Sequence, residues 1–189
     1  PTAISVILAA VLLKMGTYGI LRICYPILPD ATVYFATLMA VIGVINIVYG
    51  ALCAMAQKDF KKLIAYSSIS HMGFCLLGMS SFTPEGMNGA VLQMFNHGTI
   101  TAQLFLLVGV IYDRAHHRDL SGFGGIAQIM PRYSVLTALA FFAAMGLPGL
   151  SGFVSEVLCF LGGFKAFPTI TIIAASGVVL TAAYMLWAY

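Results

Sequence analysis

The sequence predicts an all-α, polytopic membrane protein with about six transmembrane helices. Of its 189 residues, 61% are hydrophobic and only 8% are charged, whereas soluble domains are about half apolar and about a quarter charged. The mean hydropathy is +0.99. A chain of this composition lacks the polar surface that a water-soluble fold needs, so the composition excludes the soluble and disordered classes.

Charge and cysteine content argue against two further classes of protein. The formal charge is only +3 and the basic residues are scattered, so nothing indicates binding to nucleic acid. Four cysteines in apolar runs do not make a secreted disulfide scaffold: Cys24, Cys53, Cys75 and Cys159.

Six stretches are long and apolar enough, or nearly so, to cross about 30 Å of hydrocarbon, which takes roughly 20 residues. They cover residues 2–24, 33–56, 63–80, 89–112, 133–163 and 167–189, with approximate bounds. We expect residues 1–189 to form a single transmembrane domain. Because the chain starts at Pro1 and stops inside an apolar run, we also expect it to be a piece of a longer membrane chain.

The basic residues predict the orientation of these spans, because short loops rich in Lys and Arg stay on the inner side. The second and fourth joins hold six basic residues, and the opposite side holds only Arg22 and Lys165. The six are Lys58, Lys61, Lys62, Arg114, Arg118 and Arg132. The second and fourth joins are therefore predicted on the cytoplasmic or matrix side.

The fifth stretch is predicted to contain a broken helix around Leu147-Pro148-Gly149. Proline removes a backbone donor and clashes with the preceding turn, and glycine loosens the backbone. Unpaired backbone at membrane depth is tolerated only where protein or a water-filled cavity receives it, as in transporters built on inverted repeats. An ordinary proline kink without a transport role is the alternative.

Lys14 lies twelve residues into the first span, roughly 18 Å deep at 1.5 Å per residue. A lysine stem of about 6 Å is too short to reach the membrane surface from there. Because a buried lysine changes its protonation state readily, we favour a proton-carrying role over simple snorkelling.

Two histidines lie at similar depth in the third and fourth spans. Imidazole titrates near neutral pH and can therefore pass a proton in either direction. His71 lies among serines, and His97 belongs to a polar stripe with Gln93 and Thr101 at four-residue steps. A structural histidine satisfied by a neighbouring helix is the alternative for His71, and tight helix packing is the alternative for the stripe.

Glu156 follows Pro148 by eight residues and is the only acidic residue inside a predicted span. The neighbours of a buried carboxyl group determine whether it is charged. We favour a proton-transfer role, and a plain pairing partner for Lys14 is the alternative. Lys14, His71, His97 and Glu156 together outline a row of ionisable groups through the centre of the membrane, in which the charge of each group influences the protonation of the next.

The sequence has no CxxC, phosphate-loop or dinucleotide-binding pattern that would indicate redox chemistry.

Several segments closely resemble the antiporter-like membrane subunits of respiratory complex I. The most recognisable is residues 61–74 (KKLIAYSSISHMGF), and the resemblance is to the chain-M type, called NADH dehydrogenase subunit 4 in mitochondria. Residues 12–19 (LLKMGTYG), 94–98 (MFNHG) and 146–156 (GLPGLSGFVSE) support it.

The resemblance implies a fold of about fourteen helices in two inverted repeats, of which this chain holds the eighth to thirteenth. It implies that Lys14, His71, His97 and Glu156 match the family's central lysine, two histidines and chain-M-type glutamate. It also implies a proton-translocating subunit of NADH:quinone oxidoreductase in a bacterial plasma membrane or organellar inner membrane, surrounded by other membrane-arm subunits.

The redox chemistry is expected elsewhere in such a complex. This chain is expected to bind no cofactor or metal, while NADH, FMN, iron–sulfur clusters and quinone belong to partner subunits. Two alternatives share these motifs: a subunit of a multisubunit Na⁺/H⁺ antiporter, and a membrane subunit of a hydrogenase or formate-linked complex.

Overall fold

The chain forms a bundle of long helices, as the composition predicts. The computed structural model describes residues 2–189, and within them it contains helices and no named strand. Five segments are long and apolar enough to cross a membrane: Thr2–Ile27, Ala36–Met55, Phe60–Ser80, Pro84–Ala115 and Pro168–Ala188. The last four are helices α5, α6, α7 and α11.

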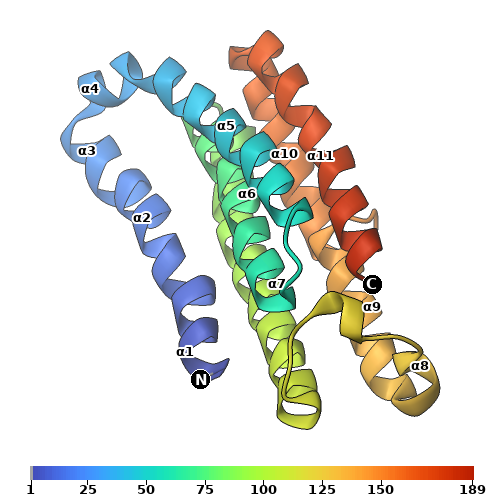
Figure 1. The fold of residues 1–189 in the computed structure, drawn as a ribbon. Helices are drawn as coiled ribbons and strands as arrows, with labels where there is room; N and C mark the ends of the chain where they lie inside the picture. Colours follow the sequence, from blue (N-terminus) through green and yellow to red (C-terminus); the bar gives the residue numbers. More distant parts are fainter. Residues whose placement is uncertain (1) are drawn as a thin grey trace.

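The first segment is a composite helix that stands beside the bundle (Figure 1). Its consecutive parts are α1 (Thr2–Ile7), η1 (Leu8–Leu12), α2 (Leu13–Gly19), η2 (Ile20–Cys24) and α3 (Tyr25–Ile27). The η1 and η2 parts are π-helical, a wider winding that is common at functional sites. The helix extends three residues past the predicted end at residue 24, and α4 (Pro29–Tyr34) links it to α5.

The predicted break in the fifth stretch is confirmed. Helix α9 (Pro131–Ala144) ends and α10 (Ser151–Ala166) begins on either side of a turn at residues 145–150. Gly146 and Gly149 in this turn have φ of 71° and 97°, in the left-handed region that only glycine adopts readily. The two half-helices together replace one continuous span.

Polar side chains fix where the neighbouring helices begin. Asp59 accepts hydrogen bonds from the backbone amides of Lys61 and Lys62 at 2.8 and 3.3 Å and so caps α6. Thr83 caps α7 in the same way through Gly86. Each cap satisfies amides that the first helical turn leaves free, which is why both helices start several residues before the predicted bounds of 63 and 89.

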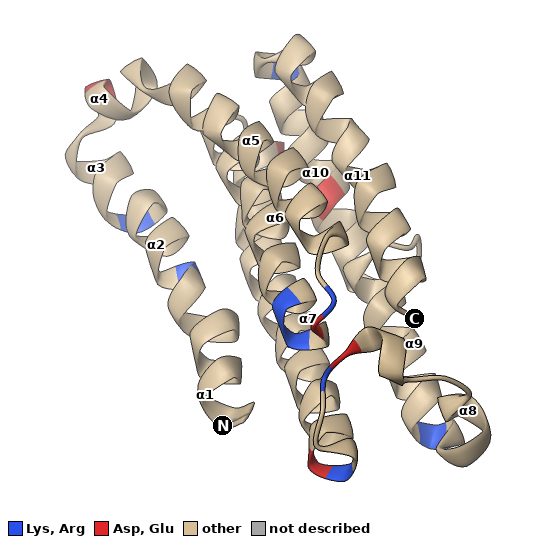
Figure 2. Ribbon diagram, viewed as in Figure 1, with Lys and Arg blue, Asp and Glu red and all other residues tan. Residues whose placement is uncertain are grey.

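The two basic joins meet at one end of the bundle. Asp59 pairs with Asp119 in an isolated β-bridge, and its carboxylate lies 3.1 Å from the Arg118 guanidinium. In Figure 2 blue segments lie on the composite first helix and at the opposite end of the bundle, and other blue segments mark the start of α6 and the end of α7. The positive-inside rule assigns this end to the inner side, and we call it the inner end. At the opposite, outer end Lys165 pairs with Glu85 at 2.5 Å.

Glycine allows α5 and α6 to approach closely. A Cβ atom at Gly73 would lie 2.5 Å from the Gly43 carbonyl oxygen and 2.9 Å from the Ile47 amide nitrogen. Backbone atoms cannot yield as a flexible side chain can, so only glycine fits at residue 73.

We predict that Gly73→Ala lowers the stability of the protein although alanine favours helices. Forcing a methyl group into this contact should cost about 1–3 kcal/mol, measured as a lower midpoint of thermal unfolding of the purified protein. Gly124→Ala is the matched control, because no heavy atom lies within 4 Å of a Cβ at that residue. Equal midpoints for the two variants would contradict the close-contact account.

Candidate functional site: a buried polar cluster

Three helices meet around the site at mid-bundle: α6, α7 and α10. Helix α6 is the most buried of the five candidate spans, and α7 and α10 pack against it. The ionisable groups at mid-bundle on these helices, His71, His97 and Glu156, are buried.

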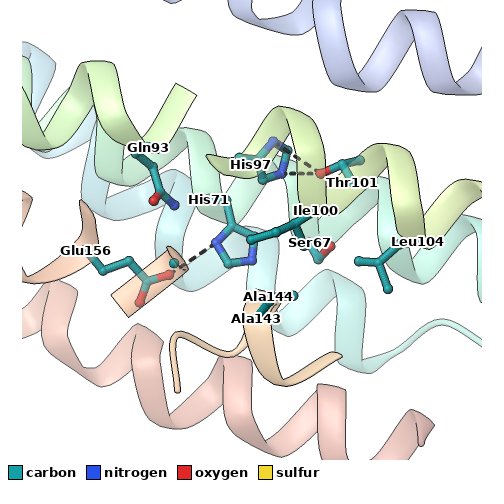
Figure 3. A pocket seen from close by; sticks show the side chains of 11 residues that line it. Ser67, His71, Gln93, His97, Ile100, Thr101, Leu104, Ala143, Ala144 and Glu156 are labelled. Atoms are coloured by element: carbon teal, nitrogen blue, oxygen red, sulfur yellow. Dashed lines mark hydrogen bonds and ion pairs between the residues drawn. The ribbon is translucent and has the colours of Figure 1, made fainter. Parts of the chain in front are cut away.

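His71 and Glu156 form the centre of the cluster (Figure 3). His71 Nδ1 lies 3.5 Å from Glu156 Oε1, and the two residues are only 4% and 6% exposed. Neither ring nitrogen of His71 has a hydrogen-bond partner within the described residues. This distance is slightly beyond a good hydrogen bond, so a small movement or one water would connect the two groups.

The broken helix places Glu156 in this position. Glu156 lies in the second turn of α10, and its carboxylate is folded back against the turn that precedes the helix. A Cβ at Gly146 would lie 2.5 Å from Glu156 Oε2. The glycine therefore serves two needs: it adopts a positive φ and it leaves room for the carboxylate.

His97 extends the cluster along α7. Its ring centroid lies 5.3 Å from that of His71, and its Nε2 lies 3.0 Å from the Thr101 hydroxyl. His97 is 4% exposed. The sequence predicted this stripe of Gln93, His97 and Thr101, and in the structure it faces the other helices of the cluster.

A hydrogen-bonded network ties α7 to α10 next to Glu156. The Ser155 hydroxyl donates to Gln93 Oε1 at 2.5 Å, and the Asn96 amide donates to Ser155 Oγ at 3.2 Å and to the Ser151 carbonyl at 2.7 Å. The sequence analysis gave no role to Asn96 or Ser155. Asn96 could have been found from its place in the polar stripe, three residues after Gln93, and Ser155 from its position beside Glu156.

A small cavity lies among these side chains. Its volume is about 10 Å³, close to the room that one water molecule needs. Six polar or ionisable side chains line it together with apolar neighbours. The six are Ser67, His71, Gln93, His97, Thr101 and Glu156. The cavity is too small for a ligand, and its polar side chains offer hydrogen-bond partners to one water molecule.

Lys14 lies apart from the cluster. It is 8% exposed, and its ammonium donates to the Ala9 carbonyl oxygen at 2.5 Å, five residues earlier in the same composite helix. Within residues 2–189 no hydrogen bond or ion pair joins Lys14 to either histidine or to Glu156. Glu156 therefore faces His71 and does not pair with Lys14, which was the alternative considered for it.

Two more buried hydroxyls lie on α11 and were missed by sequence reasoning. Thr181 and Tyr184 are 2% and 0% exposed, and their hydroxyl groups have no hydrogen-bond partner within the described residues. Their spacing of three residues places them on one face of the helix. No group of three or more His, Cys, Asp or Glu that could hold a metal ion occurs within residues 2–189.

Comparison with known proteins places this arrangement in a family. A family model described as "NADH:quinone oxidoreductase/Mrp antiporter, TM" matches residues 1–181. The chain is 48% identical over its whole length to NADH-quinone oxidoreductase subunit M of Rhodobacter capsulatus, of which it covers 37%. It is 49% identical, over 97% of its length, to an NAD(P)H-quinone oxidoreductase chain 4 of Microcystis aeruginosa, of which it covers 34%.

Two solved structures are similar as well. Respiratory complex I from Thermus thermophilus with bound NADH contains a chain that matches 94% of this one with a TM-score of 0.91 and 39% identity, over 38% of its own length. The Mrp complex from Dietzia contains a chain that matches 92% with a TM-score of 0.86 and 26% identity, over 32% of its own length. The chain thus spans about a third of the length of these relatives.

We predict that Ser155→Ala weakens the contact between α7 and α10. The substitution leaves the buried Gln93 carbonyl oxygen without its donor, which should cost about 1–3 kcal/mol and lower the midpoint of thermal unfolding. The control is Ser176→Ala, because Ser176 is exposed and bonds only within its own helix, to Ile173. A Ser155→Ala protein as stable as this control would show that the network does not hold the two helices together.

Proposed function

The chain belongs to the NADH:quinone oxidoreductase/Mrp antiporter transmembrane family, and from that premise we propose that it is part of a proton-translocating membrane-arm subunit of an NADH:quinone oxidoreductase. In this proposal the other membrane-arm subunits are its partners. NADH, FMN, iron–sulfur clusters and quinone are handled by other subunits, so this chain moves protons and carries no redox step itself.

The observation that carries the proposal is the buried His71–Glu156 pair with His97 behind it. Keeping ionisable groups inside a membrane costs several kcal/mol by insertion scales, and a purely structural role needs only one polar contact. Here three titratable side chains from three helices lie within reach of one another and line one small cavity. Such an arrangement suits proton transfer.

We propose the following order of transfer. Lys14 holds the proton first, and His97 and His71 relay it to the Glu156 carboxylate, from which it leaves toward the outer side. Between His71 and Glu156 the proton crosses 3.5 Å. Between the two imidazole rings it crosses through a water in the cavity, since water-mediated hydrogen bonds are nearly as favourable as direct ones.

The related antiporter is a second candidate, favoured by the structural match to the Mrp complex. Identity is higher to the complex I chain, at 39% against 26%, and this difference supports the oxidoreductase assignment. Purification of the intact assembly and identification of its other subunits distinguish the candidates: quinone-site and NADH-binding subunits support complex I, and their replacement by antiporter or hydrogenase subunits contradicts it.

We predict that Glu156→Gln abolishes most proton pumping while the complex still assembles. The amide keeps the shape of the carboxyl but cannot take up a proton, and loss of a proton-transfer group should lower the pumping rate by about tenfold or more. Pumping is measured as acidification of the lumen of inside-out vesicles on addition of NADH. The matched control is Glu85→Gln at the outer end, where the carboxylate pairs with Lys165 outside the buried cluster. Normal pumping by an assembled Glu156→Gln complex would refute the role.

We predict that Lys14→Ala also depresses pumping, by about tenfold, because the first carrier in the file is lost. Replacing His71 or His97 singly by Ala should reduce pumping less, since a water can occupy the space and bridge the gap. Arg22→Ala is the control, because Arg22 lies in the same composite helix but is exposed. If Lys14→Ala and Arg22→Ala pump equally well in the vesicle assay, Lys14 is not a proton carrier.

A further inference from the structure

Two hydroxyl groups on α11 are buried beside the cluster, and the proposed order of transfer does not use them. Thr181 and Tyr184 are 2% and 0% exposed, and neither hydroxyl has a hydrogen-bond partner within residues 2–189. Burying an unpaired hydroxyl costs free energy that valine or phenylalanine of nearly the same shape would avoid. Buried polar groups of this kind therefore call for an explanation.

Apolar contacts place the tyrosine on the inner side of the cluster. Tyr184 belongs to the same apolar core as Ile64 of α6 and Ala144 at the end of α9. Because α6 begins at the inner end, Ile64 lies on the inner side of Ser67. Ala144 also lines the small cavity, so this core adjoins the cavity.

Polar side chains of the cluster act on the Tyr184 hydroxyl. It interacts with the side chains of Ser67 and Glu156, and with Thr181 one turn earlier in α11, but the geometry of these contacts falls short of a hydrogen bond. Ser67 and Glu156 both line the small cavity, and Tyr184 lies outside its lining. The tyrosine can therefore affect the cavity only through these neighbours.

Ser67 can link the tyrosine to the cavity. Its hydroxyl donates to the Ile64 carbonyl at 2.8 Å, and the oxygen of such a hydroxyl can still accept two hydrogen bonds. Tyr184 supplies an unused donor, so a small movement of the phenol would complete a bond between them. Ser67 precedes His71 by one turn on the same face of α6, and both line the cavity. A bond from Tyr184 would therefore fix the cavity wall next to His71.

We propose that Tyr184 is a positioning residue of the buried cluster: its hydroxyl donates to Ser67 Oγ and so fixes the polar wall of the cavity that His71 and Glu156 share. Thr181 donates to the phenol oxygen from one turn earlier, which satisfies the second unpaired hydroxyl. The tyrosine itself gives up no proton during turnover. This inference rests on the proposed role of Glu156 in proton transfer, and it adds α11 to the helices that shape the site.

Infrared difference spectroscopy of the complete complex, combined with the vesicle pumping assay, tests the role of Tyr184. Tyr184→Phe keeps the aromatic ring and removes only the hydroxyl. The carboxylic acid band of Glu156, identified by its absence in Glu156→Gln, should still appear and disappear as NADH is oxidised, but at a shifted frequency. Pumping should fall about threefold, the effect of losing one neutral hydrogen bond.

Tyr133→Phe is the matched control for a purely structural tyrosine. Tyr133 is also buried, and its hydroxyl donates to the Leu107 carbonyl at 3.1 Å, outside the lining of the small cavity. Tyr133→Phe should lower the midpoint of thermal unfolding but leave pumping and the Glu156 band unchanged. If it shifts the band and slows pumping as much as Tyr184→Phe does, the effect is a general loosening and the positioning role is refuted.

A double-mutant cycle tests whether Tyr184 acts through Ser67. Ser67→Ala removes the acceptor, so adding Tyr184→Phe to Ser67→Ala should slow pumping no further. Two independent losses that multiply in the double variant would contradict the proposed link between the two hydroxyl groups.

Thr181→Val gives a second route to the same hydroxyl pair, and it decides the matter if Tyr184→Phe does not assemble. Valine keeps the shape of threonine and removes only the hydroxyl that supports Tyr184, so the Glu156 band should shift in the same direction and by less. Thr171→Val is the control in the same helix, because its hydroxyl bonds to the Phe167 carbonyl at 2.9 Å. Equal bands for the two valine variants would refute the positioning role.

The outcomes separate this inference from the proposed function. If Tyr184→Phe pumps normally with an unshifted band while Glu156→Gln does not pump, the positioning role is refuted and the proposed function stands. If Tyr184→Phe loses pumping as completely as Glu156→Gln, the tyrosine carries protons itself and the positioning role is again refuted. If Glu156→Gln pumps normally, the proposed function fails and this inference fails with it.

Discussion

The cost of holding ionisable groups in a medium of low dielectric constant constrains the whole structure. Bulk water does not solvate such groups inside the bundle, so each needs a partner within the protein or a single bound water. Glu156 faces His71, and His97 meets the Thr101 hydroxyl. Lys14 donates to a backbone carbonyl. These contacts offset part of the cost of burying the three groups.

The broken helix follows from the same constraint. A continuous helix through residues 145–150 would satisfy its own backbone, and the break leaves carbonyl and amide groups that the polar interior must receive. In return, α10 begins at mid-bundle, and Glu156 comes close to the backbone of Gly146 and to His71. The Gln93–Ser155–Asn96 network then holds the second half-helix against α7. Backbone irregularity and buried charge are therefore parts of one arrangement.

Much of this could be predicted from the sequence, because it is encoded locally. Composition gives the membrane class, Pro148 and its glycines give the break, and lysines and arginines mark the inner end. The polar stripe on α7 follows from its four-residue spacing. What could not be predicted depends on contacts between distant residues: that Glu156 faces His71 rather than Lys14, and that Asn96 and Ser155 join α7 to α10. The π-helical turns beside Lys14 were also missed, because a shift in backbone hydrogen bonding leaves no mark in hydrophobic periodicity.

The most direct test of the account is infrared difference spectroscopy of the complete complex during turnover. If the buried cluster carries protons, the carboxylic acid region should contain a band that appears and disappears as NADH is oxidised and that is missing in Glu156→Gln. The band should shift in heavy water, because the carboxyl group exchanges its proton. A Glu156 carboxyl that stays in one protonation state throughout turnover would contradict the central claim that protons pass through this site.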